Sequence, residues 1–135
     1  MAIQLSVAVR NARLDAIETA IGVSAKLMIF TGAMPADCAT ATSGTKLTED
    51  DLLSDWAAAA SAGAKALSSL PITTTGLAAG SAGYFRLFAS DGTTCHLQGT
   101  ITATGGGGDM TLDNIVIASG QTVNITGFTL TDGNA

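Results

Sequence analysis

The chain has 135 residues, a formal net charge of -5 and 13% charged residues. This length suits one domain, residues 1–135, that buries about two-thirds of its unfolded surface without metals or disulfides. The acidic balance and the few, scattered basic residues argue against a nucleic-acid or anionic-membrane partner, because both bind clustered lysine and arginine. Aromatic residues make up only 4%, so we expect a core of small side chains and a neutral surface suited to protein contacts.

Residues 6–22 carry the clearest helical pattern. Ser6 can cap the start of the helix, and Gly22 suits its end. The apolar positions fall on one face, which comprises Val7, Leu14, Ile17 and Ile21. That face would pack on the protein's own sheet or on a neighbouring subunit, and both interpretations stay open here. No apolar run reaches the roughly 20 residues of a membrane span, and the start lacks a signal-peptide pattern, so we expect synthesis in the cytoplasm.

The next segments predict a strand, a long loop and a short helix. Residues 26–31 form an apolar run bounded by glycine, which is typical of a buried strand. Residues 32–48 are rich in small and polar residues, so we expect an exposed loop that serves as a contact arm or is simply mobile. Met34 and Pro35 are its candidate contact residues. Residues 49–62 resemble a capped helix start followed by alanines, which predicts one or two helical turns.

Beyond Pro71 the pattern is that of β structure. Residues 83–103 predict an antiparallel hairpin, with Asp91 and Gly92 in a type I′ turn. Alternation within that hairpin places Tyr84, Arg86 and Phe88 on one face and Phe85, Leu87 and Ala89 on the other.

The last third predicts further strands joined by glycine-rich connections. The glycine run at 105–108 leads into an expected strand, so we expect a flexible hairpin connection and not a phosphate-binding loop. Two or three more strands follow between residues 114 and 131. The alternation changes phase at Gly127, which predicts a β-bulge there. The fold class is therefore mainly β: a β-sandwich or jelly roll over residues 26–131 with one N-terminal α-helix.

The chemistry-bearing residues form no catalytic pattern. Cys38 and Cys95 permit one disulfide, but without a secretory signal we expect two free, inert thiols. These two cysteines and His96 lack the four paired ligands of a structural zinc site. The acidic run at 49–51 is expected to be a solvated helix start. We therefore predict no enzyme activity, no cofactor and no metal.

Several segments together resemble a family of small structural proteins of tailed-bacteriophage particles. The resemblance covers nearly the whole chain in order and spacing, although each segment alone is simple in composition. It is carried by Leu5-Ser-Val-Ala-Val-Arg-Asn-Ala, Thr31-Gly-Ala-Met-Pro-Ala, Gly83-Tyr-Phe-Arg-Leu, Ser90-Asp-Gly, Gly105 to Leu112 and Ile117-Ala-Ser-Gly-Gln-Thr-Val.

The resemblance implies a virion protein, best matched by jelly-roll cement or decoration proteins that bind the outer surface of a capsid. It implies contact with a major capsid protein, self-association as a homodimer or homotrimer, and a location on the capsid exterior after synthesis in the bacterial cytoplasm. A tail, neck or fibre component is the alternative. A glycan-binding adhesin is a weaker one, because few aromatic residues are present to stack on sugars.

Overall fold

The computed structural model describes residues 3–133. Within this part of the chain lie one helix and nine strands. They are α1 (Val7–Ile21), β1 (Lys26–Thr31), β2 (Lys46–Asp51), β3 (Ala64–Ala66), β4 (Ile72–Thr75), β5 (Gly80–Phe88), β6 (Cys95–Ala103), β7 (Met110–Leu112), β8 (Val116–Ile117) and β9 (Thr122–Thr131).

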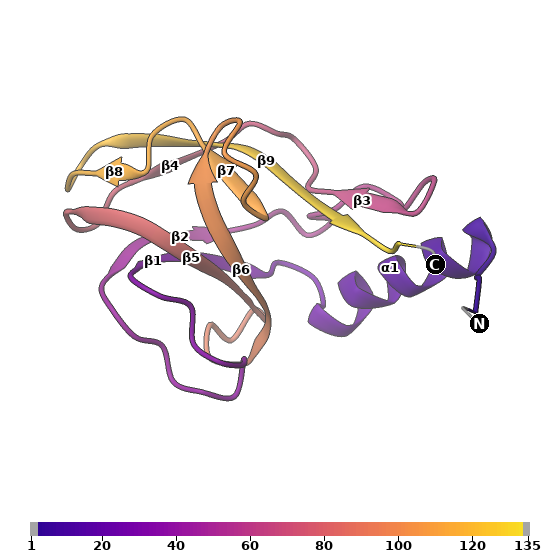
Figure 1. Cartoon of the computed structure of the whole chain (residues 1–135). Helices are drawn as coiled ribbons and strands as arrows, with labels where there is room; N and C mark the ends of the chain where they lie inside the picture. Colours follow the sequence, from indigo (N-terminus) through magenta and orange to yellow (C-terminus); the bar gives the residue numbers. More distant parts are fainter. Residues whose placement is uncertain (1–2, 134–135) are drawn as a thin grey trace.

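The strands form one strongly curled sheet (Figure 1). Its order is β2-β1-β5-β6-β7-β9-β3, with β4 paired to β9 and β8 paired to β5. Curling brings β4 back towards β2, where the Leu77 N–H donates to the Leu47 carbonyl at 2.7 Å. The predicted fold class is confirmed: the protein is mainly β, with a curled sheet of the β-sandwich or jelly-roll kind and an N-terminal helix.

The N-terminal helix has the predicted bounds and caps. The Ser6 side chain accepts a hydrogen bond from the Val9 N–H, and the Gly22 N–H donates to the Glu18 carbonyl. Gly22 has a φ of 89°, a conformation that L side chains rarely adopt, so the helix ends there.

The predicted hairpin exists as antiparallel β5 and β6. Its faces are also as predicted, because Phe85 and Leu87 lie in the main core whereas Tyr84 and Phe88 lie in a separate buried cluster. The prediction of a type I′ turn is wrong, because such a turn needs positive φ at both central residues and only Gly92 has it. Instead, the Asp91 carboxylate accepts hydrogen bonds from the backbone N–H groups of Thr93 and Thr94.

The predicted helix at 49–62 is wrong. Residues 46–51 form β2, which pairs antiparallel with β1, and the rest of the segment contains no helix. Pairing buries Leu47 and Thr48, and Trp56 is 2% exposed with its indole N–H donating to the Gly22 carbonyl. Helix propensity of tenths of a kcal/mol per residue does not compete with this burial. The preceding loop is correspondingly shorter, 32–45 in place of 32–48.

The glycine run is not a hairpin connection, because β6 and β7 are parallel. Residues 104–109 double back along β6 before β7 begins. Gly106 and Gly108 pack against Thr102, where a Cβ on either residue would lie within 3.0 Å of the threonine. The Gly108 N–H donates to the Thr102 hydroxyl at 2.9 Å. Glycine is needed here for close approach of two backbones, not for flexibility.

The predicted bulge at Gly127 is confirmed. Thr111 pairs with Gly127 whereas Leu112 pairs with Ile125, which leaves Thr126 as the extra residue of β9. The bulge keeps Ile125 and Phe128 on the buried side of the sheet although they are three positions apart. Phe128 then meets Phe85 edge to face, with ring centroids 5.2 Å apart.

A close contact between β1 and β5 supplies the first prediction. Gly83 lies at a register shift in this pair, and a Cβ there would be 2.0 Å from the Gly32 carbonyl oxygen. We expect Gly83→Ala to lower the free energy of unfolding by about 1–3 kcal/mol, since the two strands must separate locally. Gly133→Ala is the control, because open space surrounds that residue. Equal urea midpoints for the two variants would contradict the expectation.

Candidate protein-contact surface

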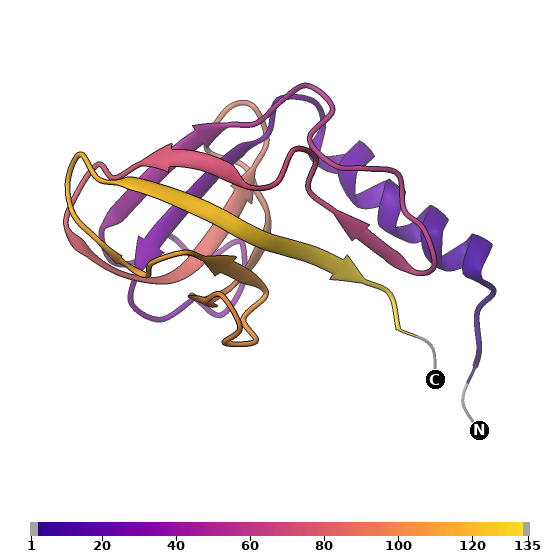
Figure 2. The same cartoon turned by 90° about the horizontal axis from the view of Figure 1, so that it is seen from above.

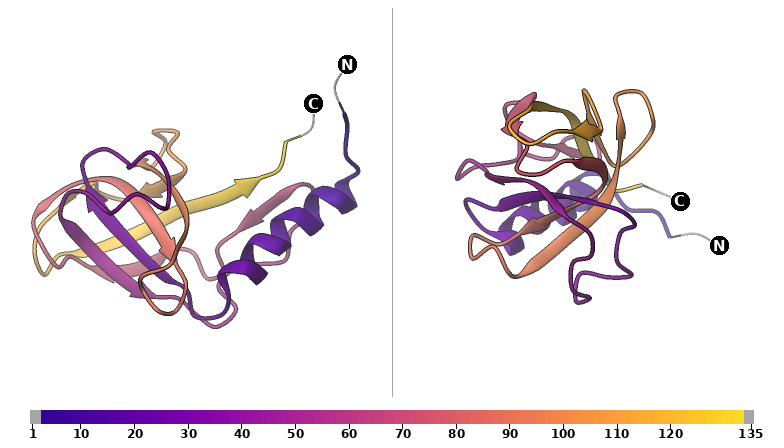
Figure 3. Two further views of the ribbon diagram at one scale, coloured as in Figure 1. Left: turned by 90° about the horizontal axis from the view of Figure 1, so that it is seen from below. Right: turned by 90° about the vertical axis from the view of Figure 1, so that its left-hand side faces the viewer.

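Part of the molecule extends beyond the end of the curled sheet, and we call it the stalk. It consists of α1, residues 57–67 including β3, and residues 129–132 at the end of β9. Figures 2 and 3 show these segments side by side, with the described chain beginning and ending at this end of the molecule. The antiparallel pairing of β3 with residues 129–131 attaches the stalk to the sheet.

A buried lysine joins the helix to the stalk's strands. The Lys65 side chain is 1% exposed, and its ammonium lies 2.8 Å from the Asp15 carboxylate and 2.7 Å from that of Glu18. It also donates to the Ala58 carbonyl at 2.9 Å. Burial alone lowers the pKa of Lys65, but the hydrogen bonds to the two carboxylates outweigh it and raise the pKa above its usual value.

The same contact also acts on the helix carboxylate. The hydrogen bond from Lys65 is the main cause that holds the pKa of Asp15 below its usual value, and the Ala60 N–H, which donates at 2.9 Å, adds to it. Asp15 is therefore ionised at neutral pH and bonded to two separate parts of the chain.

Three more polar residues of the helix bond to the rest of the stalk. Arg10 donates to the Asp132 carbonyl at 3.0 Å, and Arg13 pairs with the Asp132 carboxylate at 3.2 Å. The side-chain amide oxygen of Asn11 accepts a hydrogen bond from the Gly63 N–H at 2.9 Å. Each charged side chain of α1 is thus bonded to another part of the protein, although those of Arg13 and Asp15 stay partly exposed.

The outer face of α1 is consequently small and nearly neutral. Four alanines recur every fourth position on it, and each is exposed: Ala8, Ala12, Ala16 and Ala20. Val9 and Thr19 lie on the same arc and are exposed as well, and Arg13 stands at its margin. A face of alanines lets a second backbone approach closely and needs little desolvation, so we regard it as the candidate contact surface.

Of the four candidate contact residues on the helix, three are buried or partly buried and one is exposed. Leu14 and Ile21 are 3% and 4% exposed, and Ile17 packs partly buried against the core, so these three serve the protein's own fold. Val7 is 49% exposed at the start of the helix. The alanine face was missed because alanines carry no hydrophobic pattern, and only the fourfold spacing marked it.

The candidate contact residues of the loop lie in a segment that hydrogen bonds attach to the sheet. Met34 is 40% exposed, whereas Pro35 is half-buried and its carbonyl accepts from the Gln98 amide at 2.7 Å. Further along the loop, the Tyr84 hydroxyl donates to the Ser43 carbonyl at 2.7 Å. The loop thus lies across the outer face of β5 and β6 with a defined path.

The buried Arg86 provides the central attachment of this loop. Its guanidinium donates to the carbonyls of Asp37 at 3.0 Å and Thr40 at 2.8 Å, and to Gln98 at 3.1 Å. Arg86 is only 2% exposed, so these carbonyls replace its hydration. Three side chains on one face of the sheet therefore hold the loop, namely Tyr84 and Arg86 of β5 and Gln98 of β6.

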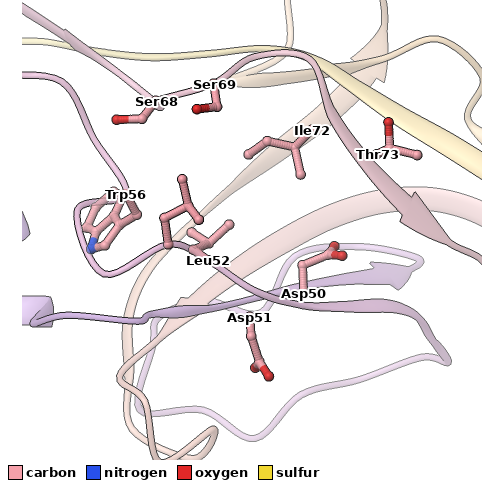
Figure 4. Close-up of a pocket in the computed structure, with 9 residues that line it drawn as sticks. Asp50, Asp51, Leu52, Trp56, Ser68, Ser69, Ile72 and Thr73 are labelled. Carbon is pink, nitrogen blue, oxygen red and sulfur yellow. The ribbon is translucent and has the colours of Figure 1, made fainter.

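A pocket of about 280 Å³ opens between β2 and the start of β4 (Figure 4). Leu52, Trp56 and Ile72 form its apolar side, and Asp50 and Asp51 stand at its edge. Its described lining residues include hydroxyls and carboxylates but no histidine, cysteine or lysine. Burial raises the pKa of Asp50, against a hydrogen bond from Thr74, and one buried carboxylate oxygen has no hydrogen-bond partner.

Comparisons with known proteins identify no relative. No protein-family model, no curated protein and no solved structure matches the chain. Across residues 3–133, no group of three or more histidine, cysteine, aspartate or glutamate residues is arranged to hold a metal ion. No helix among these residues is long and apolar enough to cross a membrane.

The buried ion pair supplies a prediction about the stalk. We expect Lys65→Met to lower the free energy of unfolding by about 1–3 kcal/mol, because two carboxylates lose their charged hydrogen-bond donor. Lys46→Met is the control, since Lys46 pairs with Glu49 on an exposed strand and should change stability by less than about 1 kcal/mol.

The pH dependence gives that experiment a second measurement. Because the folded pKa of Asp15 is lowered, the pair stabilises the protein above the unfolded pKa and this stabilisation is lost as pH falls through the folded value. Urea unfolding from neutral to acidic pH should therefore show a smaller acid loss in Lys65→Met than in wild type. An equal loss would contradict the role given to the pair.

Asp50 should affect the pH dependence of stability in the opposite direction to Asp15. Its folded pKa is raised, so the ionised carboxylate destabilises the protein as pH rises through that value. Asp50→Asn should therefore be more stable than wild type at neutral pH, and the difference should vanish in acid. Asp51→Asn is the matched control, because it removes an exposed pair with Lys26 and should change stability by less than about 1 kcal/mol. Thermal unfolding at several pH values measures both, and a pH-independent gain would refute the assignment.

Proposed function

We propose that this protein is a structural component of a tailed-bacteriophage particle, a cement or decoration protein that binds the outside of the head and stabilises it. The sequence resemblance supplies the phage assignment, and the alanine face of α1 is the observation that carries a packing function. The face is exposed and lies on a helix that the buried Lys65 joins to the stalk's strands through Asp15 and Glu18.

The shape of the stalk supports this function. A helix attached by charges on its inner side is presented at a fixed angle, so a partner need not order it on binding. Small outer side chains lose little rotamer entropy when they are covered. We therefore expect the face to contact a second copy of the chain or the capsid subunit.

The charge balance fits an exterior location. A net charge of -5 disfavours close approach to packaged DNA, whereas an outward-facing protein is not repelled in this way. A protein that binds only the assembled lattice stabilises it by mass action, and many modest contacts add over the shell. Such a role requires a surface that fits the lattice and many equivalent binding sites, but no catalytic group.

The copy number in purified particles tests the proposal. A cement protein should be present in hundreds of copies per filled head, and particles stripped of it should release DNA at a lower temperature. Quantitative mass spectrometry of separated heads and tails, with a DNA-release melting curve, measures both. About a dozen copies confined to tail fractions would assign the protein to the tail or neck, and glycan binding by the isolated protein would favour an adhesin.

A surface variant tests the face itself. Ala16→Arg places a long charged side chain on the alanine face without a strong loss of helix propensity, so we expect it to reduce binding to stripped heads at least about tenfold. Ser119→Arg is the control, because Ser119 is exposed at the turn before β9, at the other end of that strand from the stalk. Both variants should keep the wild-type melting temperature. Equal head binding by the two would exclude the face as the contact.

A further inference from the structure

The two cysteines of the chain lie together although 57 positions separate them in the sequence. Both thiols are free, and the side chain of Cys95 interacts with that of Cys38. Cys38 lines the same pocket as Phe88, the residue with which Cys95 pairs across β5 and β6. Cys38 belongs to the loop at 32–45, and Cys95 is the first residue of β6. The sequence permits one disulfide but predicts two free, inert thiols, and the fold is what brings the two cysteines together.

The loop side of the pair is fixed by Arg86. Its guanidinium donates to the carbonyls of Asp37 and Thr40, which are on either side of Cys38 in the loop. Gln98, directly across the β5–β6 pair from Arg86, donates to the Pro35 carbonyl. Three hydrogen bonds thus hold the segment that carries Cys38 against the outer face of the sheet.

The sheet side of the pair is fixed by a register shift. Leu87 pairs with Leu97 whereas Phe88 pairs with Cys95, which places Cys95 beside the apolar cluster on that outer face. Cys95 packs on this cluster, which comprises Met28, Phe30, Tyr84 and Phe88. Both cysteines are half-buried, so a small reagent can reach them.

We propose that Cys38 and Cys95 are a site of oxidative modification that forms an intramolecular disulfide when the protein meets a small-molecule disulfide such as oxidised glutathione. The bond would fasten the loop covalently to β6. This inference is independent of the proposed function, because it rests only on the contacts of the isolated chain.

The reaction balances as two thiol–disulfide exchanges. The Cys38 thiolate attacks the small disulfide, which forms a mixed disulfide and releases one thiolate. Cys95 then loses its proton and attacks the Cys38 sulfur, which releases the second thiolate. The two cysteines lose two electrons, the reagent gains them, and the two cysteine protons end on the two released thiols.

The environment assigns the order of the two thiols. Cys95 packs on the apolar cluster of the outer face, whereas Cys38 lines a surface pocket, so Cys38 is the thiol that a reagent meets first. Burial and the neighbouring Cys38 raise the pKa of Cys95, which agrees with this order. Once Cys38 carries the mixed disulfide, its sulfur is an electrophile beside Cys95, and the high local concentration favours ring closure. Cys95 is therefore the resolving residue.

Oxidation of the purified full chain tests the site. After incubation with oxidised glutathione, the monomer should lose both free thiols and two hydrogen atoms of mass, and peptide mapping should recover one Cys38–Cys95 crosslink. The oxidised protein should melt about 5–15 °C above the reduced protein, since the bond closes a long loop in the unfolded chain. Retention of both thiols, glutathione on both residues, or crosslinks only between chains would each overturn the proposal.

Variants separate the chemistry from the positioning. Cys95→Ser should stop at a glutathione adduct on Cys38, with no rise in melting temperature on oxidation. Gln98→Ala keeps both thiols but removes one attachment of the loop, so ring closure should slow about 2–10-fold. Gln121→Ala is its control, because Gln121 bonds to Ala118 at a remote turn. An unchanged rate in Gln98→Ala would show that the attachment does not position the thiols.

Discussion

The burial of β5 on both faces is the constraint on which the rest of the structure depends. Residues 84–88 are all buried, although a strand of an antiparallel sheet usually leaves one face in water. The loop at 32–45 covers the second face, and there Arg86 exchanges water for the carbonyls of Asp37 and Thr40. Without the loop, the Arg86 guanidinium would stay hydrated, and Tyr84 and Phe88 would be exposed to water. Docking of the loop and burial of this face of β5 therefore occur together.

Local patterns predicted the elements whose stability is local. Helix α1 had its caps at Ser6 and Gly22, and the bulge at Gly127 appeared as a change of phase in the alternation. The failures are elements stabilised by distant partners. Residues 49–51 look like a helix start but pair with β1, and the glycine run looks flexible but packs along Thr102. Propensity is a weak term beside burial and strand pairing.

The contact surface was predictable only in part for the same reason. The helix pattern identified apolar residues, yet Leu14 and Ile21 belong to the protein's own fold. What distinguishes the outer face is the absence of charge, and this depends on where the helix charges point. Lys65 draws Asp15 and Glu18 inward from fifty and forty-seven positions away in the chain, and no helical periodicity contains that information.

The basic residues share one role throughout the described chain. Arg10 and Arg13 bond to Asp132, Lys26 and Lys46 bond to carboxylates of β2, Lys65 bonds to the helix, and Arg86 bonds to the loop. Because all six lysines and arginines bond within the protein, the rest of the described surface is mostly small, neutral or acidic, with single exposed apolar residues such as Val23 and Leu53. The contacts that we propose for such a surface depend on close fit more than on charge attraction. The few lysines and arginines of this sequence therefore serve mainly to hold the stalk and the loop in place.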